Sequence, residues 1–146
     1  MPSKDLNRIY ELVDKLSYEF DGEFSRRENH ITVELDWNSR QDTVRGRKQK
    51  ILIGRKRNLL TMKSVVVKLS GVHQLLSEVA ELKREIWRRN GLVPIVSFSI
   101  DSRQRIVGTI SILCSTVSES DLAFYLRTLA RECDRFEYVL TLTDVH

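Results

Sequence analysis

The residue types that most often carry catalysis or metal binding are few in this chain, and they are widely spaced. The histidines are His30, His73 and His146, and none of them stands at ligand spacing to another histidine or to a cysteine. The cysteines, Cys114 and Cys133, are nineteen positions apart and lack the paired spacing of a metal site. We therefore expect surface histidines, no metal, no cofactor and no enzymatic activity.

Both cysteines lie in apolar patterns, Cys114 at the end of a predicted strand and Cys133 on the apolar side of a predicted helix. Buried thiols in a reducing cytoplasm are the expected state, with a disulfide or a reactive thiol as the alternatives. Acidic residues gather near the C-terminus, but arginines alternate with them, which is typical of a solvated helix face. This group comprises Arg131, Glu132, Asp134, Arg135 and Glu137. The sequence contains no glycine-rich phosphate-binding motif.

Positive charge is concentrated in residues 40–57, which we call the basic segment. Its eight basic residues and Asp42 give a charge of +7, which leaves −3 for the rest of a chain whose net charge is +4. The basic residues are Arg40, Arg45, Arg47, Lys48, Lys50, Arg55, Lys56 and Arg57. This composition predicts a site for an anion or an acidic partner.

Several interpretations of the basic segment stay open at this point. Basic side chains on an edge strand prevent it from pairing with other sheets. The same residues could bind an acidic protein, the phosphates of a nucleic acid, or an anionic lipid. The segment contains no aromatic residue, which argues against stacking on the bases of a single strand.

The first half of the chain predicts a helix followed by three strands. Apolar residues at helical spacing indicate a surface helix over residues 5–20, which ends at an Asp-Gly pair. Alternating apolar and polar residues indicate strands over residues 30–37, 42–58 and 59–69. In the third strand, we expect the core to be met by Val65, Val67 and Leu69.

Residues 72–91 give the clearest helical pattern, and we expect the Asn90–Gly91 pair to cap this helix at its C-terminus. One apolar stripe suffices for packing on a sheet, but a second stripe lies beside it, formed by Leu76, Ala80 and Trp87. A wide apolar arc indicates either deep burial or a second contact, such as a dimer interface.

The last third predicts two more strands and a closing helix. The strands, over residues 93–101 and 105–115, are joined by a Ser-Arg-Gln turn. The helix follows over residues 118–141. Ser118 is three residues before Asp121, a variant of the helix capping box. The helix carries one long apolar stripe, formed by Leu122, Leu126, Leu129, Cys133, Phe136 and Leu140.

These elements predict an α+β fold of the order αβββαββα, in which helices cover a five-stranded antiparallel sheet. The length of 146 residues indicates a single domain over residues 1–146. Neither a signal peptide nor an apolar run long enough to cross a bilayer is found in the sequence, so we expect a cytoplasmic protein.

This order of elements resembles the type III secretion chaperone-like superfamily. Residues 126–141, LRTLARECDRFEYVLT, look like the closing helix of its YbjN-like members. The resemblance implies a bacterial, cytoplasmic homodimer that holds partner proteins in extended form. It also implies that the second helix and a neighbouring sheet strand form the dimer interface, here with Leu76, Ala80 and Trp87 of the helix. The basic charge departs from the acidic charge typical of secretion chaperones, and it favours the YbjN-like group.

Together these observations predict a non-enzymatic, chaperone-like protein that binds itself and an unidentified protein partner. The alternative is a basic regulatory module that binds nucleic acid or another polyanion through the basic segment. No membrane partner is predicted.

Overall fold

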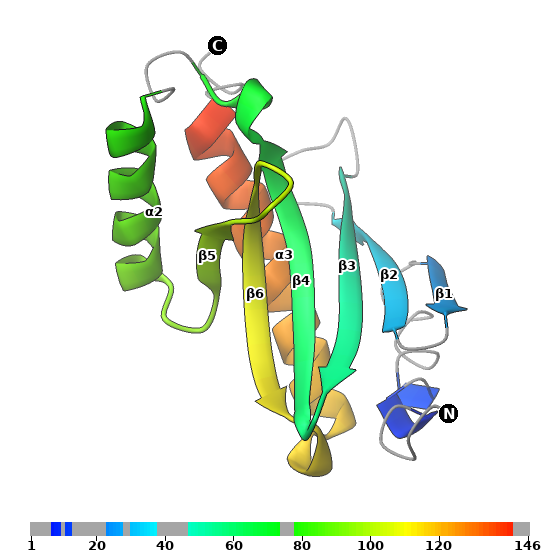
Figure 1. Cartoon of the computed structure of the whole chain (residues 1–146). Coiled ribbons are helices and arrows are strands. Elements are labelled where there is room, and N and C mark those ends of the chain that lie inside the picture. The colour runs from blue at the N-terminus through cyan, green and yellow to red at the C-terminus, as the bar shows by residue number, and fades with distance from the viewer. Residues whose placement is uncertain are drawn as a thin grey trace.

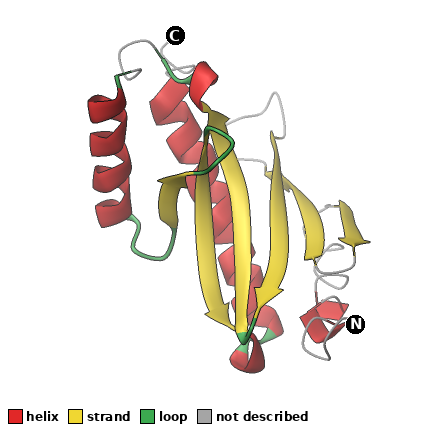
Figure 2. Cartoon of the chain, in the orientation of Figure 1, coloured by secondary structure: helices red, strands yellow, loops and turns green. Residues whose placement is uncertain are grey.

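The computed structural model describes residues 7–9, 11–12, 23–27, 30–37, 47–73 and 78–141. Six strands form one sheet, and a long helix crosses one of its faces (Figures 1 and 2). The strands are β1 (Glu23–Arg27), β2 (His30–Trp37), β3 (Arg47–Lys56), β4 (Leu59–Lys68), β5 (Ser97–Ile100) and β6 (Arg105–Leu113). The helices are α2 (Val79–Leu92) and α3 (Glu119–Thr141), with short 3-10 turns at Leu69–Gly71 and Cys114–Thr116.

The sheet is antiparallel throughout, with the strand order β1-β2-β3-β4-β6-β5. The α+β class and the antiparallel sheet are therefore confirmed, but the prediction of five strands is wrong. The additional strand is β1, which pairs with β2 from Glu23 opposite Glu34 to Arg27 opposite His30. Its sequence, EFSRR, is short and polar, and its pairing depends on backbone groups that carry no sequence signal.

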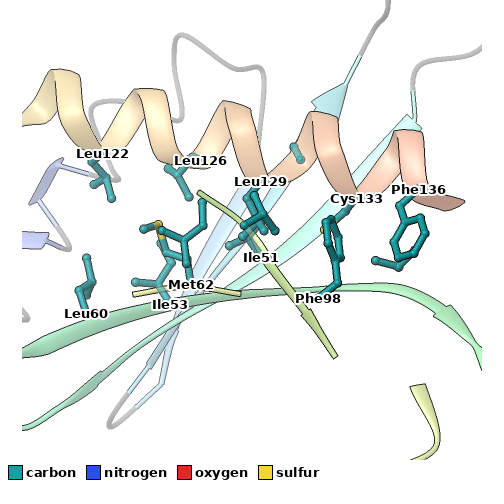
Figure 3. Close-up of a cluster of buried hydrophobic side chains, with 14 of the residues drawn as sticks. Ile51, Ile53, Leu60, Met62, Phe98, Leu122, Leu126, Leu129, Cys133 and Phe136 are labelled. Carbon is teal, nitrogen blue, oxygen red and sulfur yellow. The ribbon is translucent and has the colours of Figure 1, made fainter. Parts of the chain in front are cut away.

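Helix α3 places its predicted apolar stripe against the sheet, and all six residues of that stripe are fully buried. Figure 3 shows Leu122, Leu126 and Leu129 directed toward the strand residues of the core. The strands meet this stripe with Ile51, Ile53, Leu60, Met62, Ile106 and Ile110, which are buried as well. The predicted core face of the closing helix is confirmed.

Strand β4 turns a different set of residues to the core than the sequence pattern predicts. Met62 and Val66 are buried, whereas Val65 is exposed. Both faces of this strand carry apolar residues, so the alternation does not tell which face meets the core. In addition, a bulge between Val65 and Val67 shifts the register of β4 against β6. Beyond the bulge, Val67 and Leu69 pack against the core as expected.

Helix α2 begins at Val79, seven residues after the predicted start. Val72 has an extended backbone, and the N–H of His73 donates to the Leu140 carbonyl at 2.8 Å. The chain before α2 is thus bonded to the end of α3. At the other end, α2 continues to Leu92, and no glycine of the described part has the positive φ of a helix cap. The predicted Asn90–Gly91 cap is therefore wrong.

Residues 7–9 and 11–12 are helical, and the rest of the predicted first helix lies outside the described residues. This short segment is attached to the chain that leads into α3. Arg8 donates to the carbonyls of Val117 and Cys114, at 2.9 and 2.6 Å, and Ile9 is fully buried.

Candidate interaction surfaces

Helix α2 is held against the edge of the sheet by a side-chain amide. Asn90 Nδ2 donates to the Phe98 carbonyl at 3.0 Å, and the Phe98 N–H donates to Asn90 Oδ1 at 2.7 Å. Phe98 belongs to β5, which is the last strand of the sheet and pairs with β6 on its other side. A primary amide offers one acceptor and two donors, so Asn90 replaces a neighbouring strand at this residue.

A buried carboxylate also fastens α2 to α3. Glu132 is only 5% exposed and accepts hydrogen bonds from Arg89 at 3.2 Å, Arg131 at 3.2 Å and Arg135 at 3.3 Å. The Arg89 guanidinium also lies 5.6 Å from the centre of the Phe136 ring. The prediction of a solvated acidic face is therefore wrong at Glu132, which α2 covers, and also at Asp134, which is only 6% exposed.

The outer side of α2 remains exposed. Leu82 and Ile86 pack into the core, while Trp87 on the opposite side is 78% exposed and Ala80 is exposed with it. Leu76, the third member of the predicted second stripe, lies outside the described residues. At Ala80 and Trp87, deep burial within the chain is excluded, and a contact with a second molecule is the interpretation that stays open. An exposed tryptophan on a firmly held helix is typical of a protein interface.

The basic segment is carried by a strand inside the sheet. Arg40 and Arg45 lie outside the described residues, and Arg47, Lys48 and Lys56 are placed by the backbone of β3. Lys50, Arg55 and Arg57 are exposed. β3 pairs with β2 over residues 47–54 and with β4 over residues 51–56. Each of its basic residues therefore lies where only one neighbouring strand is paired, and protection of an open edge stays a possible explanation of its charge.

Two lysines of the basic segment stand opposite acidic residues of β2 in the strand register. The register places Lys48 opposite Asp36 and Lys50 opposite Glu34. Opposite charges at directly facing positions stabilise a pair of antiparallel strands. Farther along the chain, Arg55 is paired with Leu60 in the register of β3 and β4, and Arg57 lies in the β3–β4 turn with φ of 58°.

An open groove runs along the outer face of α3 and has a volume of about 640 Å³. Its lining combines two arginines, an exposed phenylalanine and several hydroxyl groups. The lining residues are Ser118, Glu119, Ser120, Ala123, Phe124, Arg127, Thr128 and Arg131. The sequence prediction did not include this surface. The available signal was the spacing of Phe124, Arg127 and Arg131, which places them on one helical face away from the leucine stripe.

The groups considered for catalysis lie apart. His73 belongs to the segment between β4 and α2, the backbone of His30 begins β2, and His146 is outside the described residues. The described part of the chain contains no group of three or more residues that could hold a metal ion. Cys114 and Cys133 are buried thiols, and burial raises the pKa of Cys133 to about 12 from its ordinary value of 9.0. Cys133 is therefore protonated at neutral pH and is not a nucleophile there.

Neither a family model nor a curated protein matches this chain. Solved structures do match it over most of its length. A structure of the ExsC–ExsE complex is 13% identical and has a TM-score of 0.61, covering 92% of this chain and 94% of the matched chain. The HopA1–SchA chaperone–effector complex is 14% identical with a TM-score of 0.57, covering 93% of this chain and 98% of the other.

The type III secretion chaperone SycH of Yersinia pestis, solved in complex with a stable fragment of YscM2, is 16% identical with a TM-score of 0.51. That match covers 84% of this chain and 94% of the SycH structure's chain. The chain therefore has the type III secretion chaperone-like fold that its element order predicts. No helix among the described residues is both long enough and apolar enough to span a membrane.

Proposed function

We propose that this protein is a homodimeric, chaperone-like module of the YbjN-like group that binds partner polypeptides and has no enzymatic activity. Its fold is shared with chaperones that were solved together with partner proteins or fragments of them. The observation that carries the proposal is the exposed outer side of α2, with Trp87 at its centre. This side belongs to a helix that hydrogen bonds hold in place, so the surface is presented in a fixed orientation.

The proposed dimer joins the outer sides of two α2 helices around a two-fold axis. In such an isologous contact, each Trp87 meets the same surface of the other protomer, and a single residue counts twice. A buried aromatic residue at the centre of an interface often contributes about 2 kcal/mol or more to the free energy of association. Ala80 provides the small side chain that lets two helices approach closely.

The outer face of the sheet is the proposed surface for a partner polypeptide. Leu59 and Leu113 face each other on β4 and β6, and both are exposed. Leu52 on β3 is exposed as well. The face turned away from α3 is open in Figure 1. Exposed leucines between polar neighbours suit an extended segment with apolar side chains.

The dimer is tested by measuring the mass of the protein in solution by light scattering after size exclusion. The wild type is expected at about twice its chain mass of 17.1 kDa, and Trp87→Glu is expected at the monomer mass, because a charge replaces the interface centre. Phe124→Glu is the matched control, since Phe124 is also an exposed aromatic residue on a helix, and this variant should remain dimeric. A wild-type monomer at micromolar concentration, or a Trp87→Glu dimer, contradicts the proposal.

A second candidate function is the binding of nucleic acid or another polyanion through the basic segment. It is favoured by the exposure of Lys50, Arg55 and Arg57, three basic residues on or directly after β3. This candidate makes the protein a basic regulatory module rather than a chaperone.

A further inference from the structure

We infer that the groove on the outer face of α3 binds an acidic, extended segment of a partner polypeptide. The inference rests on the proposed function, because it takes the ligand to be part of a partner protein. It assigns that partner a second surface, in addition to the outer face of the sheet and different from the outer side of α2 and from the basic segment.

The groove is an elongated surface rather than a closed cavity. Its residues run from Ser118 to Arg131, which corresponds to roughly 20 Å along a helix that rises ~1.5 Å per residue. The floor is formed by Ala123 and Thr128, which are both buried. Ser118 is engaged in the helix cap, where its Oγ accepts from the Asp121 N–H at 3.1 Å and its own N–H donates to Asp121 at 3.2 Å. The Ser118 hydroxyl is thus used within the cap, and the inference rests on the other side chains of the groove.

Two arginines supply the charge of the groove. Arg127 and Arg131 are four positions apart, so they lie one above the other on the same side of α3. Arg131 uses its Nε in the 3.2 Å bond to Glu132, and its side chain is still 42% exposed. A guanidinium has five N–H donors, so this bond leaves donors directed to solvent. Glu132 also accepts from Arg89 and Arg135, so Arg131 is one of three arginines around this carboxylate.

The third component is apolar. Phe124 is 52% exposed and lies one helical turn before Arg127, in edge-to-face contact with Tyr125 at 5.5 Å between ring centres. The groove therefore offers an apolar contact followed by two cationic contacts along one line. Glu119 lies near the opposite end from Arg131, which sets a direction for a ligand whose negative charge is at one end.

The spacing of these contacts fits an extended peptide. Side chains at i and i+4 of a helix lie about 5–6 Å apart. Alternate residues of an extended chain lie about 6.6 Å apart, because each residue advances it by ~3.3 Å. Two acidic residues separated by one other residue can therefore reach Arg127 and Arg131 together, while a preceding apolar residue lies on Phe124. A single small anion would use only one end of the groove.

The test measures fluorescence anisotropy of a labelled ten-residue peptide that has one phenylalanine followed by alternating glutamate and serine. The wild type is expected to bind it at least about tenfold more tightly than the same peptide with glutamine in place of glutamate. The double variant Arg127→Gln/Arg131→Gln should lose about tenfold in affinity. Arg127→Gln alone, which leaves the Arg131–Glu132 bond intact, should lose a smaller but measurable part.

The matched control is Arg84→Gln/Arg88→Gln on α2, which also removes two exposed arginines four positions apart. This control is expected to bind the acidic peptide like the wild type. Equal binding by the groove double variant and the wild type overturns the inference, as does an equal loss in the control. Complete displacement of the peptide by millimolar inorganic phosphate also overturns it, since it identifies a simple anion site.

The peptide assay and the dimer assay test the two proposals independently, so one proposal can fail while the other stands. The groove belongs to α3 of one protomer, so Trp87→Glu is expected to bind the acidic peptide with wild-type affinity even as a monomer. Loss of peptide binding in Trp87→Glu overturns the assignment of the site to the α3 groove alone. A wild-type protein that is dimeric but does not bind the peptide overturns the groove and leaves the proposed dimer standing.

Discussion

Gly108 shows most directly how one residue determines the contact between the sheet and α3. It lies on β6, and a Cβ atom at this position would be 2.7 Å from the Cys133 Sγ and 3.1 Å from side-chain atoms of Phe98 and Val96. Real Cβ atoms do not approach other atoms to 2.7 Å. The absence of a side chain therefore sets how closely Cys133 packs on the sheet, in the region drawn in Figure 3.

We predict that Gly108→Ala lowers the free energy of unfolding by about 1–3 kcal/mol, because the methyl group forces Cys133 and the helix outward. Denaturant titration measures this loss. Combining Gly108→Ala with Cys133→Ala removes the nearest obstacle, so the double variant should be more stable than the sum of the single effects predicts.

The matched control for this prediction is Gly91→Ala. Gly91 is in the last turn of α2, and a Cβ at this position meets nothing within 4 Å. Alanine favours a helix over glycine, so Gly91→Ala should raise the free energy of unfolding by about 0.5–1 kcal/mol. A Gly108→Ala variant as stable as the wild type, or strict additivity with Cys133→Ala, is the contrary result.

At the scale of elements, the position of α2 decides which surfaces the protein offers. Besides packing Leu82 and Ile86 into the core, the helix is bonded through residues near its C-terminal end, Arg89 to the buried Glu132 and Asn90 to the edge strand β5. These contacts cover part of that sheet edge and turn Trp87 outward. Loss of the contacts would expose backbone groups of β5 to other strands and release the orientation of the proposed dimer surface.

We predict that Asn90→Ala lowers the free energy of unfolding by about 1–3 kcal/mol and increases the exchange rate of the Phe98 amide hydrogen. The physical reason is that this hydrogen has its 2.7 Å acceptor on the Asn90 side chain. Hydrogen exchange followed by nuclear magnetic resonance measures the rate at that single amide.

The conservative variant Asn90→Asp separates the two hydrogen bonds of the amide. Aspartate keeps an acceptor for the Phe98 N–H but has no donor for the Phe98 carbonyl. Its Phe98 amide should therefore exchange more slowly than that of Asn90→Ala. An unchanged exchange rate in Asn90→Ala would show that α2 is held in place by its other contacts.

At the scale of the whole molecule, charge is distributed unevenly among regions with different roles. The basic segment carries +7, whereas the rest of the chain carries −3. The described residues of the segment belong to β3 and the turn after it, and the sheet fixes their positions. The arginines of α3 form a second cationic region, separated from the first in the sequence. We therefore propose two distinct surfaces for acidic partners.

We predict that the basic segment gives weak binding to a nonspecific DNA duplex at low salt, with a slope set by the number of phosphates neutralised. Replacing Arg55 by glutamine and Arg57 by asparagine should reduce the slope of log affinity against log salt by about 1.8, since each phosphate contributes ~0.9. Asparagine is chosen because it accepts the left-handed backbone of Arg57. Filter binding at several salt concentrations measures the slope.

The control for the duplex measurement is again Arg84→Gln/Arg88→Gln, which removes the same amount of charge from α2. An equal reduction of the slope in this control indicates a response to net charge alone. A slope that is unchanged in the basic-segment variant removes Arg55 and Arg57 from the proposed polyanion site.

The sequence by itself predicted the elements whose signals are local. The six-residue stripe of α3 repeats with helical period, and every member is buried. The capping pair Ser118 and Asp121 forms as expected, because both partners lie within one turn. The order of elements sufficed to predict the secretion chaperone-like fold, apart from strand β1. Periodicity and capping carry this information because they depend on neighbours a few positions away.

Only the tertiary structure decided the features that depend on distant partners. Strand β1 exists through backbone bonds to β2, and α2 starts late because His73 is bonded to the end of α3. Glu132 is buried because Arg89, 43 positions earlier, reaches it. Asn90 binds an edge strand instead of ending its own helix. Backbone hydrogen bonds and long-range ion pairs leave no periodic pattern in the sequence, so the tertiary structure alone decided that Trp87 is exposed and that Glu132 is buried.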